Sequence, residues 1–403
     1  MTTASRHAVA ALLDDIEAAP DAHALFATTS ERLRRVAPFD AAVWVATDPV
    51  NGLTTAPVRV ENLHEGGCGT YWESELLAEH VNLFRDLARA RVPVAGLRAV
   101  TGDRPEASAL YRNFMRPRGF TDELRAVFRI GGRPWGQLSL FRERGRAEFT
   151  RAEVALLDTL STPLAQRLRA FAQPGPVASA VAGAAWTEPG SPASKGGDAV
   201  NGVGASPGAL TPVDISDGPG MLLFDADGGL VSINAEARDL LAQMPPGPAT
   251  ATPLGIDLPL PVWILSTAGR ARLTGGSTRI RIRSVTGRWL VCHASCLRDA
   301  EGRPGATAMV IEPAKPSEIA ALVVAAYELT RREMEVVELI ARGLGTADIA
   351  ARLVVSPHTV RDHVKAVFDK VGVTSRGELV AKLFTEFQEP LLPRGTVRVE
   401  TAG

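Results

Sequence analysis

A cluster of charged and polar residues near the C-terminus has the types and spacing needed to read DNA bases. His358, Arg361, Asp362 and Lys365 follow one another at i, i+3, i+4 and i+7, which places all four on one face of a helix. Arginine and lysine can donate to guanine O6 and N7, and aspartate can accept from cytosine N4. The alternative is an ordinary solvated helix face, which the charges alone do not distinguish. The surrounding helices therefore decide between the two interpretations.

The polar face belongs to the third of four predicted helices. A capping-box pattern from Thr330 to Glu333 opens the first helix, and Gly343 ends it. Thr346 is expected to cap a second helix that ends near Leu353. A short second helix joined by a tight turn to the third predicts a helix-turn-helix inside a four-helix unit.

The third and fourth helices also begin at recognisable caps. Ser356 precedes Pro357, a favoured pair of residues at a helix start, and Gly372 ends this third helix. A second capping-box pattern, from Ser375 to Glu378, opens the fourth. Apolar residues at helical spacing should close the four helices on one core: Val336, Val337, Ile340, Ala341, Leu344, Val360, Val364, Val367, Phe368, Val371, Leu379, Val380, Leu383, Phe384 and Phe387.

Residues 329–384 resemble the DNA-binding domain of LuxR/FixJ-type transcription regulators. The resemblance rests on L-T-R-R-E-M-E-V-V-E-L-I-A-R-G, D-I-A-A-R-L, S-P-H-T-V-R-D-H-V-K and V-T-S-R-G-E-L-V-A. It implies a recognition helix from about Ser356 to Val371 and a fourth helix that serves dimerisation. Gly345 and Ala347 differ from the Ser and Lys of many relatives. The resemblance implies base contacts from Arg361, Asp362 and Lys365, and backbone contacts from Thr346, Ser356, Thr359, His363 and Lys370.

The chain upstream is predicted to form two α+β domains. Helices flank antiparallel strands in residues 1–172, and residues 20–172 resemble a GAF-type sensory domain. Residues 213–313 resemble a PAS-type domain through G-M-L-L-F-D-A-D-G-G-L-V-S-I-N-A-E-A. The expected fold class is therefore multidomain: two α+β sensory domains, GAF-like and PAS-like, and a C-terminal all-α four-helix helix-turn-helix domain.

Composition and helical pattern indicate the remaining domain boundaries. Residues 173–212 are rich in Pro, Gly, Ala and Ser with little charge, which predicts a flexible linker. A connector helix is expected over 314–328, the helix-turn-helix domain over 329–388 and a tail over 389–403.

Several local patterns give further expectations. An amphipathic stripe predicts one long helix over 71–91, and a second helix is expected over 105–115. Arg279, Arg281 and Arg283 alternate with isoleucines, which indicates a solvated sheet face by default and a partner or anionic ligand as the alternative.

Metal and catalytic sites are not predicted. Cys292 and Cys296 would share one face of a strand while His293 faces the other way, so the three cannot converge on a metal. His64 and Cys68 are two isolated residues in a Gly-rich loop, and we expect them to be structural rather than reactive. The chain contains no G-x-x-x-x-G-K-[ST] phosphate loop. We therefore expect no catalytic residue, no metal and no cofactor, and leave the ligand of the sensory domains open.

Composition restricts the partners and the compartment. The 403 residues carry 44 basic and 45 acidic side chains, a net charge of -1, so DNA binding has to be local. The strongly apolar run 319–327 is far shorter than the roughly 18 residues of a membrane helix. Three cysteines and an acidic N-terminal region indicate a cytoplasmic protein without a membrane partner.

These patterns together predict a sequence-specific DNA-binding transcription regulator. Its partners would be double-stranded DNA and a second copy of the chain, with RNA polymerase as a further candidate. Two alternatives remain open: a sensory-domain enzyme such as a nucleotide hydrolase or kinase, and ligand-free dimerisation scaffolds that feed the same DNA-binding domain.

Overall fold

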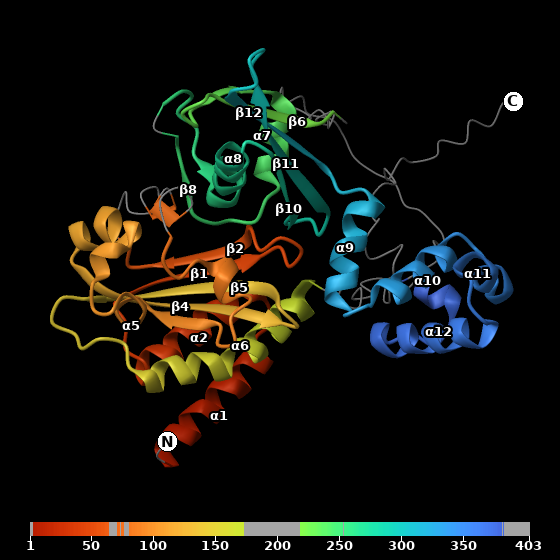
Figure 1. Cartoon of the computed structure of the whole chain (residues 1–403), viewed down its shortest axis with the longest axis horizontal. Helices are drawn as coiled ribbons and strands as arrows, with labels where there is room; N and C mark the ends of the chain where they lie inside the picture. The colour runs from red at the N-terminus through yellow and green to blue at the C-terminus, as the bar shows by residue number, and fades with distance from the viewer. Residues whose placement is uncertain are drawn as a thin grey trace, which may run out of the picture.

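The computed structural model describes residues 3–63, 71–72, 74–75, 80–172, 218–252, 254–380 and 382. It shows two sheet domains followed by a helical C-terminal unit (Figure 1). The predicted linker, the C-terminal tail, the pair His64 and Cys68, and the end of the fourth C-terminal helix lie outside the described residues. The predicted domain limits stay predictions.

The first domain is built on a five-stranded antiparallel sheet in the order β2-β1-β5-β4-β3. The turn between β1 and β2 is closed by hydrogen bonds from Gly52 N to Asp48 O, at 2.7 Å, and from Asp48 N to Leu53 O, at 2.9 Å. Gly52 has φ +75°, which a residue without Cβ adopts at little cost. The strands are β1 (Ala41–Thr47), β2 (Thr54–Glu61), β3 (Val94–Gly96), β4 (Phe120–Ile130) and β5 (Arg133–Glu143).

Helices and aromatic side chains cover both faces of this sheet. Figure 1 shows α1 (Thr3–Ala18), α2 (Ala22–Val36) and α6 (Arg151–Ala172) on one face. Trp44 lies there between Phe26 and Phe128, with ring centroids 5.6 and 6.0 Å apart. The opposite face carries four packed, buried rings: Tyr71, Phe114, Phe120 and Phe141.

The predicted long helix over 71–91 is wrong. Asn82 has φ +52°, Leu83 is extended, and only α4 (Phe84–Leu87) is an α-helix after them. The cause lies on β4, where the buried Arg125 donates to Asn82 O at 3.3 Å and pairs with Glu75 at 2.5 Å. A buried guanidinium needs these acceptors, and meeting them overrides the local helical pattern.

The second predicted helix of this region is also wrong, because residues 105–115 form separate short turns. The described segments are α5 (Leu97–Thr101), a 3-10 turn η2 (Pro105–Ala107), a π-helical turn η3 (Tyr111–Met115) and a 3-10 turn η4 (Arg116–Arg118). Their role is to bring Phe114 and Met115, both fully buried, onto the aromatic face of the sheet.

The second domain contains a five-stranded antiparallel sheet in the order β10-β11-β12-β6-β7. Within each domain the order from edge to edge is second, first, fifth, fourth, third, so the two sheets have the same topology. The elements are β6 (Gly220–Phe224), β7 (Leu230–Ile233), α7 (Ala235–Ala242), β8 (Ala249–Thr250), β9 (Leu260–Pro261), α8 (Val262–Thr274), β10 (Ser277–Arg283), β11 (Trp289–Arg298) and β12 (Pro304–Pro313).

Helix α8 was not expected from the sequence. Val262, Trp263, Ile264, Ala268 and Ala271 are buried on several of its sides, so its sequence lacks the amphipathic period by which a surface helix is found.

The cysteines of β11 lie as expected. Cys292 and Cys296 are buried and His293 is exposed on the other face. Burial raises the pKa of the Cys292 thiol above its usual range, so this thiol stays protonated.

The three parts of the chain meet around Arg281 of β10. Its guanidinium pairs with Asp48 at 2.8 Å, and its Nε donates to the backbone oxygen of Glu318 at 2.5 Å. The exposed fractions of the Arg281 and Asp48 side chains are 4% and 0%. The default interpretation of this arginine as solvated is therefore wrong: it joins both sheet domains to α9 (Pro316–Ala326).

Candidate nucleic-acid interface

The C-terminal unit consists of α10 (Arg331–Ala341), α11 (Thr346–Leu353), α12 (Pro357–Val371) and a helical turn over 376–380 (Figure 1). The capping box that opens α10 is formed: Glu333 N donates to Thr330 Oγ1 at 3.2 Å, and Thr330 N donates to Glu333 Oε2 at 2.7 Å. The predicted boundaries of α10, α11 and α12 are confirmed to within a residue or two.

The turn between α11 and α12 fixes the angle between the two helices. Val354 adopts φ +55° and ψ +50° and is 89% exposed, an unfavourable conformation for a β-branched side chain. Val355 N then donates to Ala350 O at 3.0 Å, and Ser356 Oγ accepts from Thr359 N at 3.1 Å. These bonds end α11 and begin α12 within three residues.

The expected role of Thr346 as a cap is wrong. Gly345 holds the cap position of α11 without a side-chain bond, because it has no side chain to offer. Thr346 is the first residue of the helix, and its Oγ1 accepts from Arg376 Nη2 at 2.7 Å. Arg376 also donates to Leu344 O at 3.0 Å, so the fourth helix holds the turn between α10 and α11.

Helix α12 buries one side and exposes the other. Val360, Val367 and Val371 are buried against the core formed with Val336 and Ile349. Burial of each valine contributes about 1.5–3 kcal/mol. Because these residues fix the rotation of the helix, the opposite side faces solvent.

The exposed side brings together the three predicted base-reading residues. Arg361, Asp362 and Lys365 are all exposed. His358 Nδ1 lies 2.9 Å from Asp362 Oδ2, so the side chain that contacts the Asp362 carboxylate is a histidine. Within the part of the chain that the structure describes, Arg361 and Lys365 form no hydrogen bond or ion pair.

The five residues expected to contact the DNA backbone differ in their positions and in their hydrogen-bond partners within the protein. Ser356 and Thr359 lie at the start of α12 with their hydroxyl oxygens 2.9 Å apart, and His363 is half-buried. Thr346 is engaged by Arg376, as described above. Lys370 Nζ donates to Glu333 Oε2 at 2.6 Å and to Glu328 O at 3.1 Å.

The Lys370–Glu333 pair was missed by the sequence reasoning. The sequence identifies Glu333 only as a capping-box residue. Its ion pair with Lys370 forms because α12 packs against α10, which the sequence pattern does not show. Burial acts to raise the pKa of Glu333, but the hydrogen bonds from Lys370 and Thr330 outweigh it and hold the pKa below its usual value.

We expect Glu333→Gln to destabilise the C-terminal unit at neutral pH, by about 1–3 kcal/mol, because Lys370 and Thr330 lose a charged acceptor. A carboxyl with a lowered native pKa stabilises the fold above its unfolded pKa, and this contribution disappears as the pH falls through the native pKa. The difference in unfolding free energy should therefore shrink below about pH 4.

Urea unfolding of the parent and of Glu333→Gln between pH 3 and 7 measures this. Glu335→Gln is the matched control, because Glu335 lies on the same helix and pairs with arginines at the surface. A constant difference between parent and Glu333→Gln at every pH would contradict the expectation.

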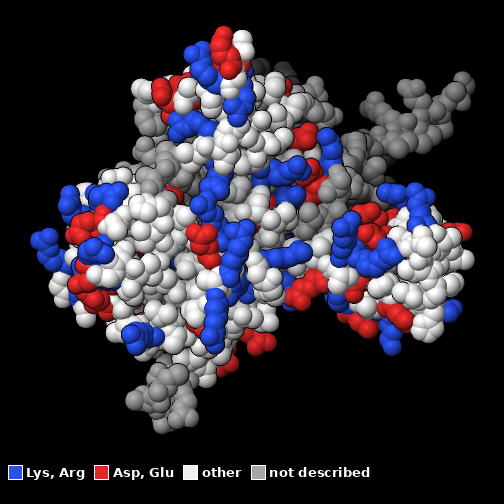
Figure 2. Space-filling view, in the orientation of Figure 1, with Lys and Arg blue, Asp and Glu red and all other residues white. Residues whose placement is uncertain are grey.

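Charge is distributed without a single basic field over the face shown in Figure 2. Lysine and arginine are interspersed with aspartate and glutamate on the sheet domains and on the helical unit. The net charge of -1 agrees with this pattern. Attraction to a polyanion therefore has to come from a few local side chains.

Helix α11, its tight turn and α12 together define a helix-turn-helix of the type found in DNA-binding proteins. The family model described as bacterial regulatory proteins, luxR family, matches residues 327–383. The spore germination protein GerE of Bacillus subtilis is 42% identical over 55 residues, which cover 14% of this chain and 74% of GerE. The chain belongs to the luxR family of bacterial regulatory proteins.

Other similar proteins share this region or more of the chain. HTH-type transcriptional regulators of Mycobacterium bovis and Mycobacterium tuberculosis are 50% identical over 52 residues. The matched residues make up 13% of this chain and only 6% of the length of those regulators. The transcriptional regulatory protein SgaR of Hyphomicrobium methylovorum is 26% identical over 186 residues, covering 40% of this chain and 82% of SgaR.

Two solved structures are similar over parts of the chain. The VqmA dimer of Vibrio cholerae is 18% identical, covers 42% of this chain and 84% of its own, and has a TM-score of 0.20. The GAF domain of an Acinetobacter phosphoenolpyruvate-protein phosphotransferase is 12% identical and has a TM-score of 0.29. The match covers 42% of this chain and 94% of that domain. Among the described residues, no helix has the length and apolar character needed to cross a membrane.

Proposed function

We propose that this protein is a sequence-specific DNA-binding transcription regulator in which the two α+β domains control the C-terminal helix-turn-helix. The observation that carries the proposal is the exposed side of α12, where Arg361 and Lys365 are free of partners among the described residues. Long donors near the start of such a helix are what reading guanine in the major groove requires.

The proposed contacts follow from position along α12. Arg361, Asp362 and Lys365 contact base edges. The residues proposed for the DNA backbone are Thr346, Ser356, Thr359, His363 and Lys370. An ammonium has three donors, and Lys370 uses two of them for Glu333 and Glu328. The third donor is free for a phosphate, so the ion pair and the DNA contact are compatible.

The active form is proposed to be a homodimer on double-stranded DNA. One recognition helix reads only a few base pairs, and two-fold pairing supplies the remaining affinity. The fourth helix is the proposed contact between copies, and RNA polymerase is the proposed further partner of the bound dimer.

Selection of bound sequences from random DNA by the full-length chain tests this proposal. We expect two related half-sites in inverted orientation, with centres about 10 base pairs or a multiple of that apart. Native mass spectrometry of the complex should show two chains for each DNA. Recovery of a single half-site bound by one chain would exclude the dimer, and recovery of random sequence would exclude specific binding.

A nucleotide-turnover assay distinguishes the regulator from the alternative function, an enzyme with sensory domains. Purified chain incubated with nucleoside triphosphates should show no turnover above that of a heat-denatured sample. Turnover that persists in a chain deleted for the recognition helix would favour the enzyme.

A further inference from the structure

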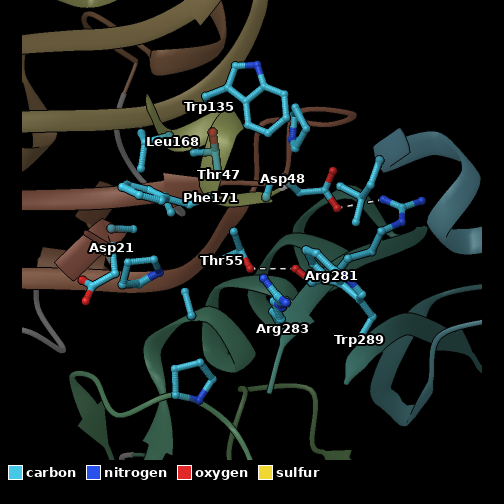
Figure 3. A pocket seen from close by; sticks show the side chains of 18 of the residues that line it. Asp21, Thr47, Asp48, Thr55, Trp135, Leu168, Phe171, Arg281, Arg283 and Trp289 are labelled. Carbon is cyan, nitrogen blue, oxygen red and sulfur yellow. Dashed lines mark hydrogen bonds and ion pairs between the residues drawn. The ribbon is translucent and has the colours of Figure 1, made fainter. Parts of the chain in front are cut away.

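A cavity of about 310 Å³ lies where the two sheet domains and α9 meet. Figure 3 shows its opposite walls: Trp135, Leu168 and Phe171 come from the first domain, and Arg283 and Trp289 from the second. Leu322 of α9 also lines it. The cavity therefore touches all three parts of the chain.

Aromatic side chains pack in the cores of both domains. Tyr71 and Phe114 pack edge to face beside the first sheet, with centroids 5.5 Å apart. Trp263 is fully buried in the second domain, and its Nε1 donates to Met244 Sδ at 3.4 Å. None of these three rings lines the cavity between the domains, whereas Trp135 and Leu168 of its wall belong to the buried cluster around Trp44.

Most polar groups in the cavity wall are already satisfied by the protein. Thr47 donates to Pro134 O at 2.9 Å, and Thr55 donates to Arg281 O at 2.8 Å. Asp48 is paired with Arg281. These groups hold the walls together and leave an apolar surface of tryptophan, phenylalanine, leucine and proline side chains toward the space.

Arg283 differs from the other charged lining residues. Its Nε makes a long contact of 3.5 Å with Gly287 O, and its two Nη atoms have no hydrogen bond to any described residue. Figure 3 shows this side chain extending from β10 toward Thr55. Asp21, at the far side, caps α2 by accepting from Ala24 N at 2.8 Å, and its carboxylate is directed away from the cavity centre.

We propose that this cavity binds a small carboxylic acid with an apolar, mainly aromatic body. The body would lie between Trp135, Phe171 and Trp289, and the carboxylate would accept from the two free Nη groups of Arg283. A guanidinium and a carboxylate match in geometry and form charge-assisted bonds. The volume is at the lower end of the roughly 300–1,000 Å³ found for ligand sites, which fits a body of one or two fused rings.

Such a ligand reaches the DNA-binding unit through one short segment. Leu322 lies on α9, Glu318 of the same helix pairs with Arg281 beside the cavity, and α10 begins five residues after α9 ends. A ligand that prefers one packing of these walls shifts the population toward that packing. This regulatory consequence rests on the proposed function, whereas the binding itself does not.

Calorimetric titration of the full-length chain without DNA tests the binding. The probes are 1-naphthoate and 1-naphthalenemethanol, which share an aromatic body and differ in the carboxylate. We expect one naphthoate per chain and about tenfold or greater loss of affinity for the alcohol, as expected for a hydrogen bond to a charged group. Arg283→Met should lower the affinity for naphthoate to that for the alcohol and leave the alcohol unchanged.

Two further variants complete the test. Arg303→Met is the matched control, because Arg303 is an exposed arginine of the same domain outside the cavity, and it should bind like the parent. Ala172, the last residue of α6, also lines the cavity. Ala172→Trp therefore places a large side chain in the wall and should abolish binding of both probes. Circular dichroism of each variant shows that it is folded.

The proposal is overturned if neither probe binds at 1 mM, or if Arg283→Met and Ala172→Trp bind naphthoate as the parent does. For regulation, naphthoate should change the DNA affinity of the parent and not of Ala172→Trp. Naphthoate binding with no DNA binding at all would refute the proposed function and leave the cavity assignment intact.

Discussion

Arg281→Ala is expected to destabilise the packing between the domains by about 3–5 kcal/mol, the cost of breaking a buried ion pair by removing one partner. Asp48 would keep its charge in a fully buried place, and Glu318 would lose the donors that hold α9 against β10. Thermal unfolding of the full-length chain, followed by circular dichroism and by tryptophan fluorescence, measures the loss.

The effect should depend on pH in a defined direction. Burial raises the pKa of Asp48 above its usual value, even though Arg281 beside it acts to lower it. Without Arg281 the pKa of Asp48 rises further, so at acidic pH the native state of the variant holds a proton on Asp48 that the unfolded state has already lost. Stability then increases as the pH falls toward the raised pKa. The loss caused by Arg281→Ala is therefore largest at neutral pH.

Two controls separate the ion pair from general effects of substitution. Arg303→Ala removes an exposed arginine of the same domain and should change stability by no more than about 0.5 kcal/mol. The double variant Asp48→Leu, Arg281→Met replaces the pair by apolar groups and should recover much of the loss. Equal unfolding curves for Arg281→Ala and Arg303→Ala would show that the pair contributes nothing.

Local signals in the sequence predicted the C-terminal unit well. The capping box at Thr330 and the Ser356–Pro357 start of α12 depend on residues within one helical turn, so the sequence contains the whole cause. The position of Arg361 and Lys365 on one exposed side follows from helical spacing once the buried valines are placed. The same reasoning predicted the antiparallel strands of residues 1–172.

Long-range contacts account for the elements that sequence reasoning missed. The helix predicted over 71–91 does not form because Arg125, more than forty residues away, donates a hydrogen bond to the carbonyl oxygen of Asn82. Arg281 is buried by Asp48, which lies over two hundred residues earlier. The interdomain cavity combines residues from Asp21 to Leu322, and no periodicity within one segment contains that information.

Arg361→Ala is expected to weaken binding to the selected DNA site by about 1–3 kcal/mol, a loss of roughly fivefold to more than hundredfold, and to relax preference at one base pair. The reason is geometric: Arg361 is exposed near the start of α12, has no protein partner among the described residues, and can donate two hydrogen bonds to guanine. Affinity measured over a library of single-base variants reports both quantities.

Asp362 and Lys370 should respond differently from Arg361. Asp362→Ala should broaden preference at a cytosine, because its acceptors are lost, while non-specific binding is largely retained. Lys370→Ala should weaken all sequences alike and reduce the slope of log affinity against log salt by about one. That variant also loses the partner of Glu333, so its folded fraction is measured first.

Arg331→Ala supplies the matched control, since Arg331 is 95% exposed on α10 and pairs with Glu335. It should leave both affinity and base preference unchanged within about twofold, as expected for a surface site. If Lys370→Ala alters base preference while Arg361→Ala and Asp362→Ala leave it intact, the groove is read by the end of α12. The base-contacting role then passes from the start of the helix to its last turn, because one rigid helix cannot place both turns equally close to the base edges.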